Sequence, residues 1–211
     1  MYADDIVLLS KSSEEMQNNL SELSKYCTKW KLDINTSKTK ILQFNKSKND
    51  KKKVFTFNDC KLESVEEYKY LGIIIHSSGS FKSAAENLNN KGMKALFKLK
   101  KTISTTSIKP SLGLKMYDQL IKPIVTYASE IWCTDFLSKM NTENFLTLAE
   151  KQPCEKSHIN FCRYLLGTNR KCVISAVRGE LGRFPIVIDM VVAIFKFVDH
   201  ITELDPSTLV A

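Results

Sequence analysis

Two adjacent carboxylates near the start of the sequence are the residues best suited to chemistry. Asp4 and Asp5 follow Tyr2 and Ala3 and precede a run of aliphatic residues at positions 6–9. This run has the length and composition of a buried strand, so both acids are expected at its N-terminal end. Two like charges beside an apolar strand are costly unless a cation neutralises them. Carboxylate oxygens suit Mg²⁺, and two such ions can hold the attacking and leaving oxygens of a phosphoryl transfer.

The same pair of acids also has a simpler interpretation. Aspartate is a common turn former, and an isolated Asp-Asp dipeptide is most often a polar turn before a strand. The rest of the chain therefore has to decide between a turn and a metal site.

The charge of the chain is high and unevenly distributed. The net charge is +8, and residues 91–122 alone hold eight lysines against one acid, Asp118, which gives +7. Such a stretch is typical of proteins that contact nucleic acid, although a lysine-rich helix face is often only solvated. We expect nucleic-acid contact from Lys91, Lys94, Lys98 and Lys101.

Hydrophobic periodicity predicts strands in the first part of the chain. A helix is expected to open at Ser12, where Ser12 and Glu15 form a capping box before an apolar stripe, and to end in a turn at residues 33–35. The stripe consists of Met16, Leu20, Leu23, Cys27 and Trp30. Strands are then expected at 6–9, 41–44, 54–57 and 66–75, with a lysine-rich loop at 46–53.

Helical patterns fill the second part of the chain. Ser83 and Glu86 form a second possible capping box for a long helix over residues 81–103, whose buried face is expected to include Ala85. Further helices are expected between the breakers at 110 and 123 and at 153 and 167, and over residues 186–201. Strands followed by helices predict an α+β fold in which two parts meet near residue 80.

The six cysteines are scattered, which favours reduced thiols. Cys154, His158 and Cys162 share one helical face, and Cys172 follows nine residues after the last of them. Zinc sites normally take ligands in pairs two to four residues apart. We therefore interpret these cysteines as core thiols and regard zinc as unlikely.

Three segments, in this order and spacing, resemble motifs of the reverse transcriptases of non-LTR (LINE-like) retrotransposons. Residues 2–5 resemble the catalytic Tyr-Ala-Asp-Asp motif, residues 30–40 the next palm motif, and residues 68–73 the primer grip. Later segments of these polyproteins resemble three further stretches, residues 120–132, 161–167 and 177–185. A group II intron maturase shares the Tyr-Ala-Asp-Asp motif but matches the region after residue 110 less well.

The resemblance implies a division of the chain into three parts. Residues 1–80 would form a partial reverse-transcriptase palm with short antiparallel strands and one helix. Residues 81–140 would form a basic, all-α thumb-like region, and residues 141–211 a C-terminal helical region. The partners implied are an RNA template and a DNA primer.

The resemblance also implies roles for single residues. Asp4 and Asp5 would be catalytic and would bind two Mg²⁺ ions in the intact enzyme, and Lys38 would be catalytic near the pyrophosphate. Contacts with the nucleotide and the primer are implied for Tyr2, Ala3, Tyr70, Leu71 and Gly72.

The chain departs from the family pattern at its first residue. It begins inside the catalytic hairpin, so the fingers and the upstream palm aspartate of the family are absent from it. We therefore expect a fragment that is inactive as a polymerase alone, with a poorly stable palm whose strands leave unpaired edges.

Two other function classes remain open. One is a non-catalytic basic module that binds RNA or DNA, and the other is an interaction protein that docks through the apolar residues 186–201. The sequence contains no signal peptide and no run that could span a membrane, so an intracellular place in cytoplasm and nucleus is expected.

Overall fold

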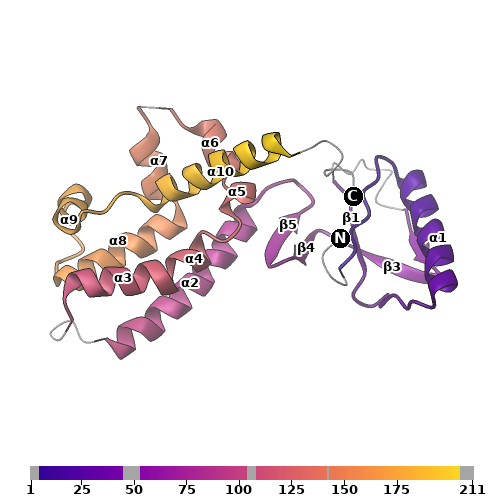
Figure 1. Cartoon of the computed structure of the whole chain (residues 1–211), viewed down its shortest axis with the longest axis horizontal. Coiled ribbons are helices and arrows are strands. Elements are labelled where there is room, and N and C mark those ends of the chain that lie inside the picture. Colours follow the sequence, from indigo (N-terminus) through magenta and orange to yellow (C-terminus); the bar gives the residue numbers. More distant parts are fainter. Residues whose placement is uncertain (1–4, 45–52, 104–107, 142, 205–211) are drawn as a thin grey trace. The chain divides into compact units, whose positions relative to one another are not determined.

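The computed structural model describes residues 5–44, 53–103, 108–141 and 143–204, and Figure 1 shows its helices and strands. The chain divides into two compact units, Met1–Ser80 and Phe81–Ala211. The first contains all the described strands and one helix, and the second contains helices alone. The predicted α+β class is therefore confirmed. Within the described ranges, every helix is too short or too polar to cross a membrane.

A helix packed against a small sheet forms the first unit. Helix α1 spans Ser13–Trp30, and strands β1, β2 and β3 span Lys40–Leu42, Phe55–Phe57 and Cys60–Val65. The strand order is β1-β3-β2, with β1 parallel and β2 antiparallel to β3. Strands β4 (Glu67–Tyr70) and β5 (Ile73–His76) pair separately as an antiparallel hairpin.

The apolar stripe of α1 builds the core of this unit, as predicted. Leu20 and Cys27 are buried with residues from all three strands, and Met16 and Leu23 are partly buried against them. The strand residues are Ile41, Phe55, Phe57 and Leu62. Trp30 was expected in the same core, but it is 59% exposed at the last residue of α1, so the buried part of the stripe ends at Cys27.

Ser12 caps the start of α1 as predicted, but the reciprocal bond from Glu15 goes to Lys11 and not to the Ser12 N–H of a capping box. The backbone N–H of Glu15 donates to Ser12 Oγ over 3.1 Å. The Glu15 carboxylate in turn accepts from the backbone N–H of Lys11 over 2.7 Å. One N–H group that the helix leaves without an intrahelical partner, that of Glu15, is thereby satisfied, together with the N–H of the residue before the cap.

Two of the strand predictions are wrong. Residues 6–9 are not a strand, because among the described residues none pairs with them; only Leu8 packs against the core, and Leu9 is 84% exposed. Residues 66–75 are two strands instead of one. The chain reverses at Leu71 and Gly72, whose φ values of 44° and 89° allow a two-residue hairpin turn. The loop predicted at 46–53 lies almost wholly outside the described residues.

The second unit is a set of helices around α8. Helices α2, α3 and α8 run side by side, and α10 packs on α5 and α8 (Figure 1). The long members are α2 (Lys82–Thr102), α3 (Pro110–Leu120), α8 (Pro153–Leu166) and α10 (Ile186–Glu203). The short ones are α4 (Lys122–Val125), α5 (Ser129–Trp132), α6 (Thr134–Lys139), α7 (Phe145–Lys151) and α9 (Ile174–Leu181).

The start of α2 differs from its prediction. The helix begins at Lys82 after Phe81, which makes no side-chain cap hydrogen bond, so Ser83 lies in the first turn and is not the cap. The buried face carries Ala84 instead of Ala85, together with Leu88, Gly92, Leu96 and Leu99. By contrast, Gly167 ends α8 in a left-handed conformation, as predicted.

Gly92 allows α2 and α4 to approach closely. A Cβ atom at this position would clash with Cγ1 of Val125, which is itself buried in α4. Gly113 in α3 makes a similar approach, because a Cβ atom there would lie 2.5 Å from Cδ2 of Leu165 in α8. At Gly179 in α9, by contrast, an added Cβ atom would have no neighbour within 4 Å.

Replacing Gly92 by alanine is expected to lower the free energy of unfolding by about 1–3 kcal/mol, because the stiff Val125 side chain has to move. Gly179→Ala is the matched control and is expected to raise it by up to about 1 kcal/mol through helix propensity. Urea unfolding followed by the fluorescence of buried Trp132, in a background where exposed Trp30 is phenylalanine, measures both. Equal stabilities of the two variants would contradict the packing at Gly92.

Candidate functional site

The expected catalytic acids lie at the edge of the described chain. Tyr2, Ala3 and Asp4 are outside the described residues. Asp5 is described and exposed, at an isolated bridge position before the irregular residues 6–10. Within the described ranges, no three His, Cys, Asp or Glu side chains form a group able to hold a metal ion. Of the two expected catalytic carboxylates, the structure thus describes only that of Asp5, which does not by itself form a metal site.

A turn organised by Asn35 holds Lys38. The Asn35 Oδ1 atom accepts from the backbone N–H groups of Ser37 and Lys38 over 3.1 and 3.2 Å. The backbone carbonyl of Asn35 accepts from the N–H of Lys38 over 3.1 Å. This network fixes the backbone and leaves the Lys38 side chain exposed. A lysine held at a defined place in this way is able to meet an anion.

The expected primer-contact residues occupy the tip of the β4–β5 hairpin. Tyr70 pairs with Ile73, and Leu71 and Gly72 form the turn between them. Leu71 is 39% exposed, and its positive φ is uncommon for a residue with a branched side chain. The hydroxyl of Tyr68 in β4 donates to the carbonyl of Lys38 over 3.4 Å.

The hydrogen bond from Tyr68 brings two of the predicted elements together. It joins the turn of Lys38 to the hairpin that carries Tyr70–Gly72. Asp5 is different, since in the described part of the chain no hydrogen bond or ion pair joins it to Lys38. The structure thus places the turn of Lys38 beside the hairpin, and the catalytic and primer-binding roles of these residues stay predictions, as do those of the acids.

The α2 lysine surface, defined as Lys91, Lys94, Lys98 and Lys101, is exposed. It lies on the side of α2 away from the buried face described above. Lys100 is different: its Nζ atom lies 4.6 Å from the ring centroid of Tyr164 in α8. Burial, and next the charge of Arg170, lower the pKa of Lys100. Lys100 therefore helps to fasten α2 to α8, and the other four lysines face solvent.

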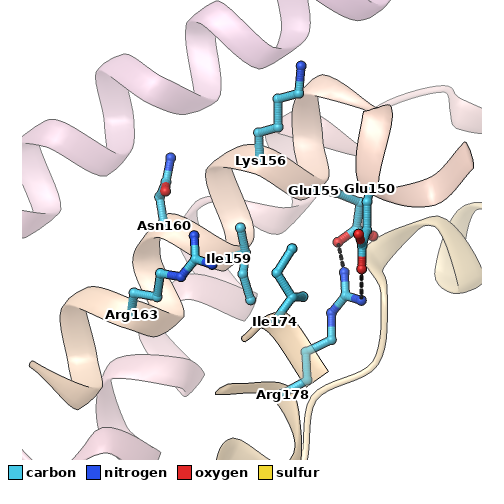
Figure 2. Close-up of a pocket in the computed structure, with 8 residues that line it drawn as sticks. All are labelled: Glu150, Glu155, Lys156, Ile159, Asn160, Arg163, Ile174 and Arg178. Atoms are coloured by element: carbon cyan, nitrogen blue, oxygen red, sulfur yellow. Dashed lines mark hydrogen bonds and ion pairs between the residues drawn. The ribbon is translucent and has the colours of Figure 1, made fainter. Parts of the chain in front are cut away.

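A buried carboxylate lies at the centre of the second unit. Glu155 in α8 is 1% exposed. One of its oxygens accepts from Arg178 Nη2 of α9 over 3.1 Å, and the other accepts from the backbone N–H of Val187 in α10 over 3.0 Å. Figure 2 shows Arg178 reaching from α9 to both Glu155 and Glu150, the latter at 3.5 Å. The carboxylate joins α8, α9 and α10.

A second ion pair extends this arrangement to α3. Arg183 donates to both carboxylate oxygens of Asp118, over 2.5 and 2.8 Å, and to Nε2 of His158 over 3.3 Å. The His158 ring is fully buried and stacks on Tyr117 with 5.2 Å between centroids. Burial alone would raise the pKa of Asp118. The hydrogen bonds and the charge of Arg183, together with the charge of Lys122, lower this pKa by a larger amount, so the net shift is downward.

Sequence reasoning missed this buried network. Its arginines lie in the stretch 177–185, which was noted only for its resemblance to later segments of retroelement polyproteins. A usable signal was present in α8, where Glu155 and His158 stand three residues apart among buried residues. Charged residues are rarely fully buried unless they are paired, so such a position predicts a partner elsewhere in the chain.

The cysteines of α8 are core side chains, as predicted. Cys154 and Cys162 are buried, and burial raises the pKa of Cys162 to about 11 and shifts that of Cys154 in the same direction. The His158 ring between them accepts a hydrogen bond from Arg183 and stacks on Tyr117. Cys172 is half-buried outside the helix.

A cavity of about 270 Å³ lies between α7, α8 and α9 beside Glu155 (Figure 2). Both arginines that line this cavity bind other groups of the protein. Arg178 pairs with both glutamates, and Arg163 donates to the carbonyl of Cys172 over 2.7 Å. We therefore interpret the cavity as a gap between packed helices and not as a binding site.

Comparison with known proteins defines the class of this chain. Residues 1–75 match the family Reverse transcriptase (RNA-dependent DNA polymerase). This match and the two relatives named below support the resemblance of the chain to the reverse transcriptases of non-LTR retrotransposons that the motifs indicated. Enzymes of the family use divalent metal ions.

Two curated relatives extend the similarity beyond residue 75. A transposon-derived protein of Caenorhabditis elegans is 30% identical over 133 residues, which are 62% of this chain and 47% of the relative. The RNA-directed DNA polymerase from mobile element jockey of Drosophila funebris is 29% identical over 139 residues, 62% of this chain and 15% of the relative. The chain thus spans half or less of the length of these relatives. No solved structure matches it.

Replacing Glu155 by alanine is expected to lower the free energy of unfolding by about 3–5 kcal/mol, because Arg178 keeps a buried charge without its main partner. Glu180→Ala, which removes an exposed acid from α9, is the control and is expected to change it by less than about 0.5 kcal/mol. Urea unfolding followed at Trp132 reports on this unit. Similar losses in both variants would show that Glu155 does not hold the helices together.

Proposed function

We propose that this chain contributes part of an RNA-directed DNA polymerase that acts on an RNA template and a DNA primer. In this proposal residues 1–80 are part of the palm, residues 81–140 a thumb-like region, and residues 141–211 a helical region behind it. The observation that carries the proposal is the family match over residues 1–75. Its place would be intracellular, in cytoplasm and nucleus.

The proposed catalytic roles follow the motifs. Asp4 and Asp5 would supply carboxylates to Mg²⁺, while Tyr2 and Ala3 would lie near the nucleotide. Lys38 would stabilise negative charge on the departing pyrophosphate, a role supported by its exposed position on the Asn35 turn.

The hairpin tip would hold the primer. Tyr70, Leu71 and Gly72 lie at a tight turn, and a glycine in such a turn permits close approach of a nucleic-acid backbone. The hydrogen bond from Tyr68 to the Lys38 carbonyl supports this role, because it links the hairpin to the turn of the proposed catalytic lysine.

The α2 lysine surface would contact the phosphates of the template–primer. Four exposed lysines on one helix can bind phosphates of any sequence, and each such contact releases counterions. Since Lys100 packs on Tyr164, the helix that carries the surface is fixed to α8. The surface would therefore act as a rigid, charged edge along the nucleic acid.

Replacing all four residues of the α2 lysine surface by glutamine is expected to weaken binding to an RNA–DNA hybrid. If each lysine meets one phosphate, the slope of log K against log salt concentration should become less steep by about 3–4. The control replaces four other exposed lysines of the same unit and should leave the slope nearly unchanged. The control residues are Lys151, Lys156, Lys171 and Lys196. Fluorescence anisotropy at several salt concentrations makes the measurement.

Polymerase activity is expected to need more than these 211 residues. The described residues contribute only Asp5 to the metal site, and two-metal chemistry needs several carboxylates in one place. Primer extension on an RNA template with Mg²⁺ and deoxynucleotides should therefore give no product with this chain. Extension that Asp5→Asn abolishes would overturn this expectation.

A non-catalytic nucleic-acid-binding module is the second candidate function. It is favoured by the location of the α2 lysine surface, which lies wholly in the second unit and does not depend on the acids. Hybrid binding without extension, unaffected by Asp5→Asn, would agree with this function. Binding that Lys38→Gln and the lysine-surface variant both weaken would favour one polymerase-derived site.

A further inference from the structure

Phe97 stands in the middle of the exposed face of α2. Its side chain is 61% exposed, and Met93, one turn earlier, is 40% exposed. An α-helix advances by about 100° per residue, since it has 3.6 residues per turn. On this geometry Lys94 and Lys101 lie about 60° and 40° to one side of Phe97, and Met93 lies about 40° to the other.

Phe97 and Met93 form a small apolar surface next to positively charged lysines. The Nζ atom of Lys101 lies over one face of the Phe97 ring, 4.8 Å from its centroid. The buried residues of α2, among them Leu96 and Leu99, are on the opposite side of the helix. Phe97 therefore does not contribute to the core of the second unit, and its ring is accessible beside several positive charges.

Accessible aromatic rings among lysines suit one class of ligand. Proteins that bind single-stranded nucleic acid combine a positive track for the backbone with aromatic side chains on which bases stack. In a duplex the bases are stacked on one another and offer no free face to such a ring, whereas the phosphates remain available to lysines. The lysines alone would thus bind both forms, and the ring would distinguish them.

We propose that Phe97, flanked by Met93, is a base-stacking contact for a single-stranded segment of nucleic acid whose backbone follows Lys94, Lys98 and Lys101. This inference rests on the proposed nucleic-acid contact of the α2 lysine surface and adds a preference for unpaired strands. The ligand is any single strand, RNA or DNA, because every base has a π face. A base that stacks on this face of the ring replaces the Lys101 ammonium there, and the ammonium then meets the adjacent phosphate.

The test compares variants of the full chain on three matched probes. The probes are a mixed-sequence RNA strand, the DNA strand of the same sequence, and the blunt RNA–DNA hybrid. Phe97→Ala is expected to weaken binding to both single strands by about 5- to 150-fold, the range for loss of one stacked base. Binding to the hybrid should change less than about twofold, and the salt slope should stay the same because the lysines remain.

Two further variants make the result specific. Phe97→Trp keeps a stacking surface and should restore single-strand binding to the level of the unchanged chain. Phe195→Ala removes an aromatic side chain that is 57% exposed on α10 and should have no effect. Circular dichroism confirms that α2 is folded in each variant.

Several results would overturn the inference. Unchanged single-strand binding by Phe97→Ala would show that the ring contacts no base. Equal losses on the strands and the hybrid would show that Phe97 acts only through the lysines. These outcomes leave the proposed function standing, whereas a chain that binds none of the three probes would overturn both.

Discussion

The carboxylate of Glu155 is removed from water inside α8, and the packing of the neighbouring helices depends on how its charge is balanced. A buried ion is costly by several kcal/mol unless other groups replace its hydration. Here Arg178 comes from α9 and a backbone N–H from the first turns of α10. The helices are therefore held in positions where these donors reach one side chain, and apolar packing fills the remaining space.

Helix α8 also holds α2, the helix that carries the exposed lysines. The single hydroxyl hydrogen of Tyr164 is shared between the carbonyls of Lys100 and Ile103, over 3.4 and 3.2 Å, and ties the C-terminal end of α2 to α8. A helix end fixed in this way keeps its side chains in defined directions. The proposed nucleic-acid contacts consequently stand on a rigid support, in agreement with the need to hold a long charged ligand at several points.

The local features of the fold were predictable from sequence, and the long-range ones were not. The Ser12 cap, the stripe of α1 and the end of α8 at Gly167 all depend on neighbours within a few turns. The hairpin at Leu71 and Gly72 was missed because leucine rarely adopts a positive φ, so the segment read as one strand. The partners of Glu155 and Asp118 lie 23 and 65 residues away, and no local pattern specifies them. For the site, the motifs named Lys38 and the hairpin residues, which the structure places near each other, but their roles stay predictions, and Asp4 lies outside the described residues.

The glycines at the helix crossings restrict how copies of this sequence can diverge. Gly92 and Gly113 meet Val125 and Leu165 so closely that any larger residue requires a compensating change in the partner helix. Gly179, on an open surface, carries no such requirement. Among related sequences, position 92 should therefore change only together with position 125, and position 113 only together with position 165, while position 179 varies freely.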